Sequence, residues 1–107
     1  MREFIFNKKD YNTYKDFYID IAKKLDAKND LNCLEPEDLG FNPNHLNEFL
    51  QDFFDETHKY IFKNFDLEKI NNYTTYDNYE WNIIFKVFKR FVDKYPNNKL
   101  EFINDED

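Results

Sequence analysis

The segment between positions 44 and 55 carries polar side chains at a spacing that could hold another molecule. One stripe of a helix would contain the residues at i, i+3, i+7 and i+11 of this segment, which are Asn44, Asn47, Gln51 and Asp55. Amides cost less to bury than carboxylates, and Phe54 borders the stripe, an arrangement typical of a partly desolvated protein contact. The alternative is that these polar side chains only face water, as they would on any solvated helix.

Residues suited to catalysis or metal binding are scarce. His45 and His58 are the only histidines and lack the paired spacing of a zinc motif, while Cys33 has no second thiol. A Cys–His nucleophile would need a fold that joins Cys33 to a histidine, and a Cys33 that packs as a small hydrophobe is favoured. One glycine cannot form a phosphate loop, and in a chain with 35% charged residues no carboxylate pair stands out. We therefore expect no enzyme, no cofactor and no metal.

A group of aromatic residues could instead stack nucleic-acid bases. It consists of Tyr73, Tyr76, Tyr79 and Trp81. The basic groove that should accompany such a platform is absent from this stretch, which carries Asp77 and Glu80. Packing in the core and in loops is therefore expected of these aromatics. The following basic residues are expected to form the solvated face of a helix; they are Lys86, Lys89, Arg90 and Lys94.

The chain is acidic, with a formal net charge of −7 from 22 acids and 15 bases. This balance disfavours direct binding of nucleic acid, which depends on neutralising phosphates with Lys and Arg. It favours a basic partner steered by the field of the protein, although acidity also serves solubility.

The lone cysteine excludes an internal disulfide, the amino terminus lacks a signal-peptide h-region, and no apolar run approaches the roughly 20 residues of a membrane span. We therefore expect a cytoplasmic protein.

The remaining pattern predicts the elements that position these residues. The 107 residues are expected to form one domain, 1–107. Apolar runs predict strands at 3–6, 58–65 and 99–104, and helical spacing predicts helices at 14–25, 43–54, 66–70 and 79–95. Polar segments predict loops at 26–41 and 71–78, where the Asn71–Asn72 pair can adopt turn conformations. Helices between the strands indicate an α/β fold with a small parallel sheet.

The predicted helix starts carry capping residues. Thr13 with Asp16 forms a capping box, and Asn42 can cap a helix whose first position is Pro43.

The order of these elements resembles the barstar-like family of intracellular ribonuclease inhibitors and related immunity proteins. The similar segments are EFIFN, YNTYKDFYIDIAKKLDA, HLNEFLQDFF, HKYIFKNFDLEKI and IIFKVFKRFVDKYPNNKLEFIND. The resemblance implies a three-stranded parallel sheet packed with about four helices. It also implies that the second helix and the loop before it cover the active site of a toxin, with acidic side chains in place of RNA phosphates.

The acids that the family uses are replaced in this chain. When Leu46 is set against the leucine that opens the inhibitory helix, the two key aspartates of the family fall on Asn47 and Gln51. A further family acid, in the last helix, falls on Arg90. The resemblance therefore implies an immunity protein with a different specificity from the family's ribonuclease inhibitors.

The favoured interpretation is a barstar-like immunity protein that binds and occludes a nuclease toxin, a ribonuclease in the first instance, in the bacterial cytoplasm. Its partner would be a protein toxin with a basic active-site cleft, and the free protein would be a monomer that contacts neither nucleic acid nor membrane directly. The alternative is a non-inhibitory interaction or regulatory module with the same fold. We assign partner binding to the second-helix face, which comprises Phe41, Asn44, Asn47, Glu48, Gln51, Asp52, Phe54 and Asp55.

Overall fold

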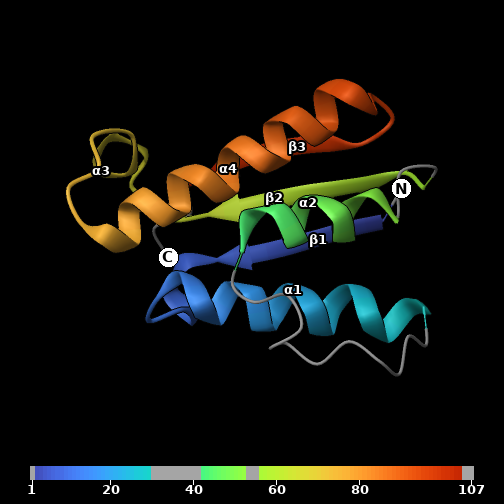
Figure 1. Cartoon of the computed structure of the whole chain (residues 1–107), viewed down its shortest axis with the longest axis horizontal. Coiled ribbons are helices and arrows are strands. Elements are labelled where there is room, and N and C mark those ends of the chain that lie inside the picture. The colour runs from blue at the N-terminus through green and yellow to red at the C-terminus, as the bar shows by residue number, and fades with distance from the viewer. Residues whose placement is uncertain (1, 30–41, 53–55, 105–107) are drawn as a thin grey trace.

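The computed structural model describes residues 2–29, 42–52 and 56–104 (Figure 1). The elements follow in the order β1 (Arg2–Asn7), the short 3-10 helix η1 (Lys8–Asp10), α1 (Tyr14–Asn29), α2 (Pro43–Gln51), β2 (His58–Lys63), α3 (Leu67–Asn71), α4 (Tyr76–Lys94) and β3 (Lys99–Ile103). The three predicted strands and four predicted α-helices are therefore confirmed. No helix in these ranges combines the length and the apolar character needed to cross a membrane.

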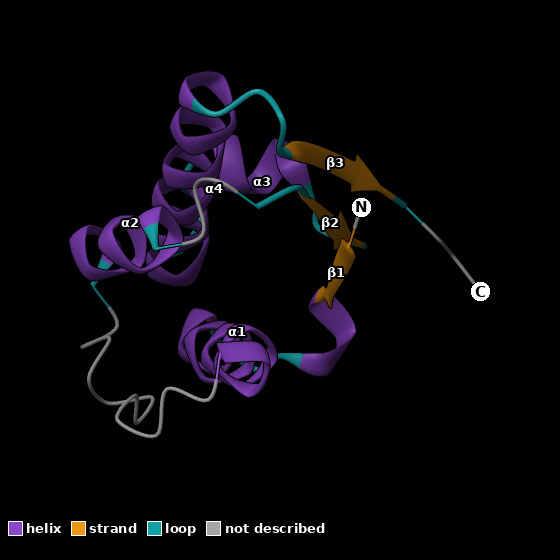
Figure 2. Ribbon diagram, turned by 90° about the vertical axis from the view of Figure 1, so that its right-hand side faces the viewer, coloured by secondary structure: helices purple, strands orange, loops and turns teal. Residues whose placement is uncertain are grey.

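The three strands form one parallel sheet in the order β1-β2-β3. Phe4 is paired with Tyr60, and Phe6 with Phe62, across the first two strands. Because side chains alternate along a strand, these four aromatic side chains share one face of the sheet, and all are buried. Figure 2 shows α1, α2 and α4 on one side of the sheet. This arrangement confirms the predicted α/β class, in which helices connect parallel neighbours.

Aromatic rings from the sheet and the helices meet in the core. Phe6 and Phe62 come from the sheet, Phe17 from α1 and Phe88 from α4, and all four are fully buried. Every pair among them has ring centroids 5.0 to 6.5 Å apart. Large aromatic side chains bury much apolar area per residue, so this small chain fills its core with few residues.

The largest differences from the predicted element boundaries are in α1, α4 and β2. α1 continues to Asn29, so the first residues of the predicted 26–41 loop are helical, whereas residues 30–41 lie outside the described residues. α4 begins at Tyr76 instead of Tyr79, because the Thr75 hydroxyl accepts a hydrogen bond from the Asn78 N–H at 3.0 Å and caps the helix there. β2 ends at Lys63, earlier than the predicted 58–65 strand.

The left-handed turn conformations also fall on unexpected residues. Asn64 (φ 66°) and Tyr73 (φ 52°) adopt them, and not the Asn71–Asn72 pair. The backbone N–H of Asn72 donates to the Glu68 carbonyl at 3.1 Å, which completes the last turn of α3. The chain therefore reverses one residue later, at Tyr73.

Asp77 ties the first turn of α4 to the start of α1. Its carboxylate accepts hydrogen bonds from the Tyr14 backbone N–H at 2.7 Å and from the Trp81 indole N–H at 3.0 Å. Trp81 is fully buried, so Asp77→Ala would leave its donor unpaired. We expect this substitution to lower the free energy of unfolding by about 2 kcal/mol. Chemical denaturation measures the loss, and Asp93→Ala, which removes an exposed carboxylate of the same helix, is the control. Equal denaturation midpoints for the two variants would contradict this role.

Candidate partner-binding site

Helix α2 is held so that its polar side faces outward. The Asn42 side chain accepts a hydrogen bond from the Asn44 N–H at 2.8 Å, and Pro43 occupies the first helical position, which confirms the predicted cap. The buried residues of α2 are Leu46, Phe49 and Leu50. These three residues anchor one side of the helix to the core, and α2 packs beside α4. Figure 1 shows the ribbons of the two helices.

The structure divides the predicted second-helix face into two parts. Asn44, Glu48 and Asp52 are exposed, whereas Asn47 and Gln51 are half-buried. The other predicted members, Phe41, Phe54 and Asp55, lie outside the described residues. Asn47 and Gln51 are therefore the two described members of this face that the rest of the protein partly covers.

A hollow lies between α2 and α4, and the two half-buried amides line it. Its volume is about 200 Å³, and its lining residues are Asn47, Gln51, Arg90, Phe91, Lys94 and Tyr95. We call this the α2–α4 hollow. It brings together two amides from α2 and a guanidinium and an ammonium from α4, so the hollow is rich in hydrogen-bond donors.

The cations of the hollow are not neutralised within the described part of the chain. Neither Arg90 nor Lys94 takes part in an ion pair there, although the Lys94 ammonium lies 5.4 Å from the centroid of the Tyr95 ring. The side chains of Asn47 and Gln51 likewise form no hydrogen bond with another described residue. Within the ranges that the structure describes, four donor side chains at one place on the surface therefore have no hydrogen-bond or ion-pair partner.

Sequence reasoning placed Lys94 on a solvated face and Phe91 and Tyr95 on the apolar face of the last helix, and so missed that they share a hollow. A signal for it was present, because Arg90 and Lys94 are separated by one helical turn, as are Phe91 and Tyr95, their neighbours in sequence.

The exposed side of α2 carries the acids Glu48 and Asp52. The described site thus combines acids on the exposed side of α2 with cations that line the hollow.

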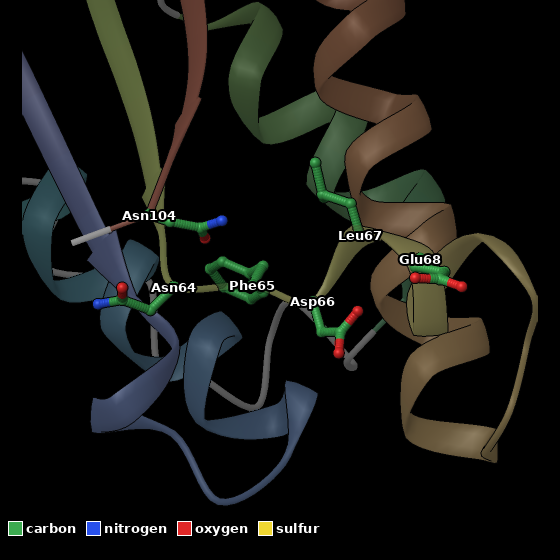
Figure 3. A pocket seen from close by; sticks show the side chains of 6 residues that line it. All are labelled: Asn64, Phe65, Asp66, Leu67, Glu68 and Asn104. Carbon is green, nitrogen blue, oxygen red and sulfur yellow. The ribbon is translucent and has the colours of Figure 1, made fainter. Parts of the chain in front are cut away.

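A larger hollow, of about 540 Å³, lies where β2 and β3 end, a position at which open parallel sheets bind ligands (Figure 3). Figure 3 shows Asn64, Phe65 and Asp66 following one another along the turn, with Asn104 beside Asn64 and Phe65. The Asp66 carboxylate caps α3 by accepting from the Lys69 N–H at 3.1 Å, and the Asn64 amide donates to Asn7 at 3.1 Å. Because these polar groups already shape the turn, we assign no ligand to this hollow.

The aromatic group at positions 73–81 is only partly in the core. Trp81 is fully buried as predicted, but Tyr73, Tyr76 and Tyr79 are exposed, which corrects the predicted packing. The early start of α4 places these tyrosines around its first turn, where the Tyr79 ring lies 5.5 Å from Tyr73 and 6.4 Å from Tyr76. Glu80 accepts a hydrogen bond from the Tyr76 hydroxyl and raises its pKa to about 12. An acid beside the exposed rings does not favour a phosphate backbone as their ligand.

The two histidines lie in different environments. His45 is exposed on α2, whereas His58 is 1% exposed, with its Nε2 3.0 Å from a Glu56 carboxylate oxygen and its Nδ1 3.3 Å from the Tyr60 hydroxyl. Cys33 lies outside the described residues. Over the ranges that the structure describes, no three His, Cys, Asp or Glu side chains gather in a way that could hold a metal ion.

Comparisons with models of protein families, with curated proteins and with solved structures gave no match to this chain. Its function has to be inferred from the residues of the site and from their arrangement.

Proposed function

We propose that this chain is an immunity-type inhibitor that binds a nuclease toxin through the second-helix face and the α2–α4 hollow and so occludes the active site of the toxin. The observation that carries the proposal is the hollow itself, where half-buried amides from α2 meet cations from α4 that form no ion pair with another described residue. Groups with open hydrogen-bonding capacity at a partly desolvated position are suited to a specific protein contact. The whole-chain resemblance to the barstar-like family and its three-stranded parallel sheet support the same assignment.

The mechanism is stoichiometric blockade and needs no bond making. The net charge of −7 would accelerate encounter with a cationic nuclease cleft, and the effect would weaken as salt is added. Glu48 and Asp52 on the exposed side of α2 would face the cationic groups of that cleft. The amides of Asn47 and Gln51 would then lose water at a smaller desolvation penalty than carboxylates at the same positions.

The compartment follows from the same proposal. An inhibitor that protects the cell in which a nuclease is made acts where the nucleic acid is, which is the cytoplasm. The single cysteine of the chain agrees with a reducing compartment, in which disulfides are rare.

Co-expression tests the proposal. The chain is produced in bacteria together with the toxin domain encoded beside its gene, and survival is compared with cells that carry the toxin alone. We expect restored growth, loss of nuclease activity in the lysate, and a one-to-one complex with a catalytically inactive toxin in size-exclusion chromatography. Unprotected cells and two separate elution peaks would rule the proposal out. A complex that leaves the nuclease active would favour the non-inhibitory interaction module.

A further inference from the structure

We propose that the α2–α4 hollow receives a carboxylate side chain, an aspartate or a glutamate of the protein partner. The inference rests on the proposed function for the identity of that partner, but the chemistry of the hollow can be tested without it. The family resemblance implies the reverse polarity, with acids on this protein that meet cations of the toxin. The charges that the described residues place at the hollow lead to the opposite expectation.

Two cations stand one helical turn apart at the hollow. Arg90 and Lys94 are exposed and lie on the same flank of α4, and Lys86 precedes Arg90 by another four residues. Like charges at this spacing destabilise a helix slightly. In a chain with 22 acids and 15 bases, a neighbouring acid would easily neutralise such a row, yet no ion pair is formed with Arg90 or Lys94 among the described residues. A bound carboxylate would supply the missing negative charge.

The size and lining of the hollow fit one small anionic group. A volume of about 200 Å³ accommodates a carboxylate with part of its aliphatic stem, and a nucleotide is too large for it. Phe91 is 2% exposed and lines the hollow with apolar surface, which lowers the local dielectric and strengthens a charged contact there. The planar guanidinium of Arg90 can hold a carboxylate through two parallel hydrogen bonds, and the two amides can donate to it from the α2 side.

A protein carboxylate is favoured over the phosphates of a nucleic acid. Nucleic-acid binding draws on many cationic contacts along a groove, whereas this chain is acidic overall and carries Glu48 and Asp52 on the exposed side of the same α2. A protein surface that places one acid among basic residues would match both parts of the site. Such a mixed pattern fixes the orientation of a partner and rejects partners with the wrong charge at this point.

The experiment uses the full chain labelled with ¹⁵N and short capped peptides as probes. Acetyl-Gly-Glu-Gly-amide is titrated against the protein by NMR, with acetyl-Gly-Gln-Gly-amide as the neutral match. We expect saturable shifts of the Asn47 and Gln51 side-chain amides and of the Arg90 Nε–H, with a dissociation constant on the order of millimolar for so small a contact. The neutral peptide should produce no saturable shift of these signals.

Variants decide whether the cations of the hollow are responsible. Arg90→Gln and Lys94→Gln should each weaken binding of the acidic peptide at least about fivefold, as the loss of one charge-assisted hydrogen bond predicts. Lys86→Gln removes the same charge from an exposed position of the same helix outside the hollow, and it should leave binding within about twofold. Equal losses in all three variants would overturn the inference, as would equal binding of the neutral peptide.

Two further results separate this inference from the proposed function. Tighter binding of inorganic phosphate than of the acidic peptide would overturn the assignment to a protein carboxylate. Cells that remain unprotected although the peptide binds at the hollow would refute the toxin as partner and leave the carboxylate site standing. Cells that are protected although the peptide does not bind would refute the carboxylate site and leave the toxin standing as the partner.

Discussion

Replacing Phe62 with alanine is expected to lower the free energy of unfolding by about 3–5 kcal/mol. Phe62 lies in the central strand of the sheet and is fully buried. Its ring centroid is within 5.1 to 5.8 Å of six other aromatic rings, those of Phe6, Phe17, Phe65, Phe85, Phe88 and Phe102. The surrounding rings come from the sheet, α1, α4 and the turn after β2, so they cannot close the cavity without moving whole elements.

Chemical denaturation followed by far-ultraviolet circular dichroism measures the loss. The matched control is Ile5→Ala on the neighbouring strand β1, where the side chain is 45% exposed and the substitution should have a much smaller effect. Because a loss of this size is a large share of the stability of a small domain, the Phe62 variant is expected to be partly unfolded at 37 °C. Comparable midpoints for the two variants would mean that the aromatic core does not hold the sheet to the helices.

The fold was predictable from the sequence where two independent local signals agree. For α1, the helical spacing of buried residues coincides with a capping box, in which the Asp16 carboxylate accepts from the Thr13 N–H at 3.3 Å and the Thr13 hydroxyl accepts from the Lys15 N–H at 3.3 Å. For α2, the apolar side coincides with the Asn42 cap and with Pro43. The strands were predictable because each is a short apolar run bounded by polar residues.

The errors arose where tyrosines made the apolar pattern ambiguous or where local sequence did not fix the length of a helix. Tyrosine has an apolar ring and a polar tip, so its position in a periodic pattern does not decide whether Tyr73, Tyr76 and Tyr79 are buried. The predicted start of α4 missed the Thr75 cap because the tyrosines after it do not follow a clear apolar periodicity. The position of the left-handed residue depended on how far α3 continued, which local sequence does not determine.

The candidate site was predictable only in part, for a related reason. The amide stripe of α2 follows from helical periodicity, and Asn47 and Gln51 do lie on one flank of that helix. The hollow depends on the packing of α2 against α4, segments that are about 40 residues apart in sequence and whose relative placement no local pattern specifies. Arg90 and Lys94 were both expected on a solvated helix face, so their place beside the amides required the structure, as did the apolar surface of Phe91.

Gln51→Arg is expected to weaken the complex with the toxin at least about a hundredfold, equivalent to about 2.7 kcal/mol. Gln51 is half-buried and lines the α2–α4 hollow, so a longer side chain at this position fills the space that the partner would occupy. The expected loss is steric, because the added positive charge alone would attract the carboxylate that the hollow is proposed to receive. Glutamine and arginine have similar helix propensities, so α2 and the stability of the free protein should be preserved.

Calorimetric titration with a catalytically inactive toxin measures the change in affinity, and thermal unfolding of the free variant verifies that the fold is intact. Asn12→Arg provides a control of equal charge change, because Asn12 is exposed on the loop before α1 and does not line the hollow. If Gln51→Arg binds as tightly as the unmodified chain, the interface lies elsewhere on the surface.

Gln51→Glu at the same position reports the polarity of the contact, since it changes charge with almost no change of shape. If the hollow receives a carboxylate, the new acid would pair with Arg90 or Lys94, occupy the donors that the partner needs and weaken binding. If the hollow instead faces a cation of the toxin, the same substitution would place an acid opposite that cation and strengthen binding. The sign of this single change in affinity therefore separates the two descriptions of the site, whichever way the arginine variant behaves.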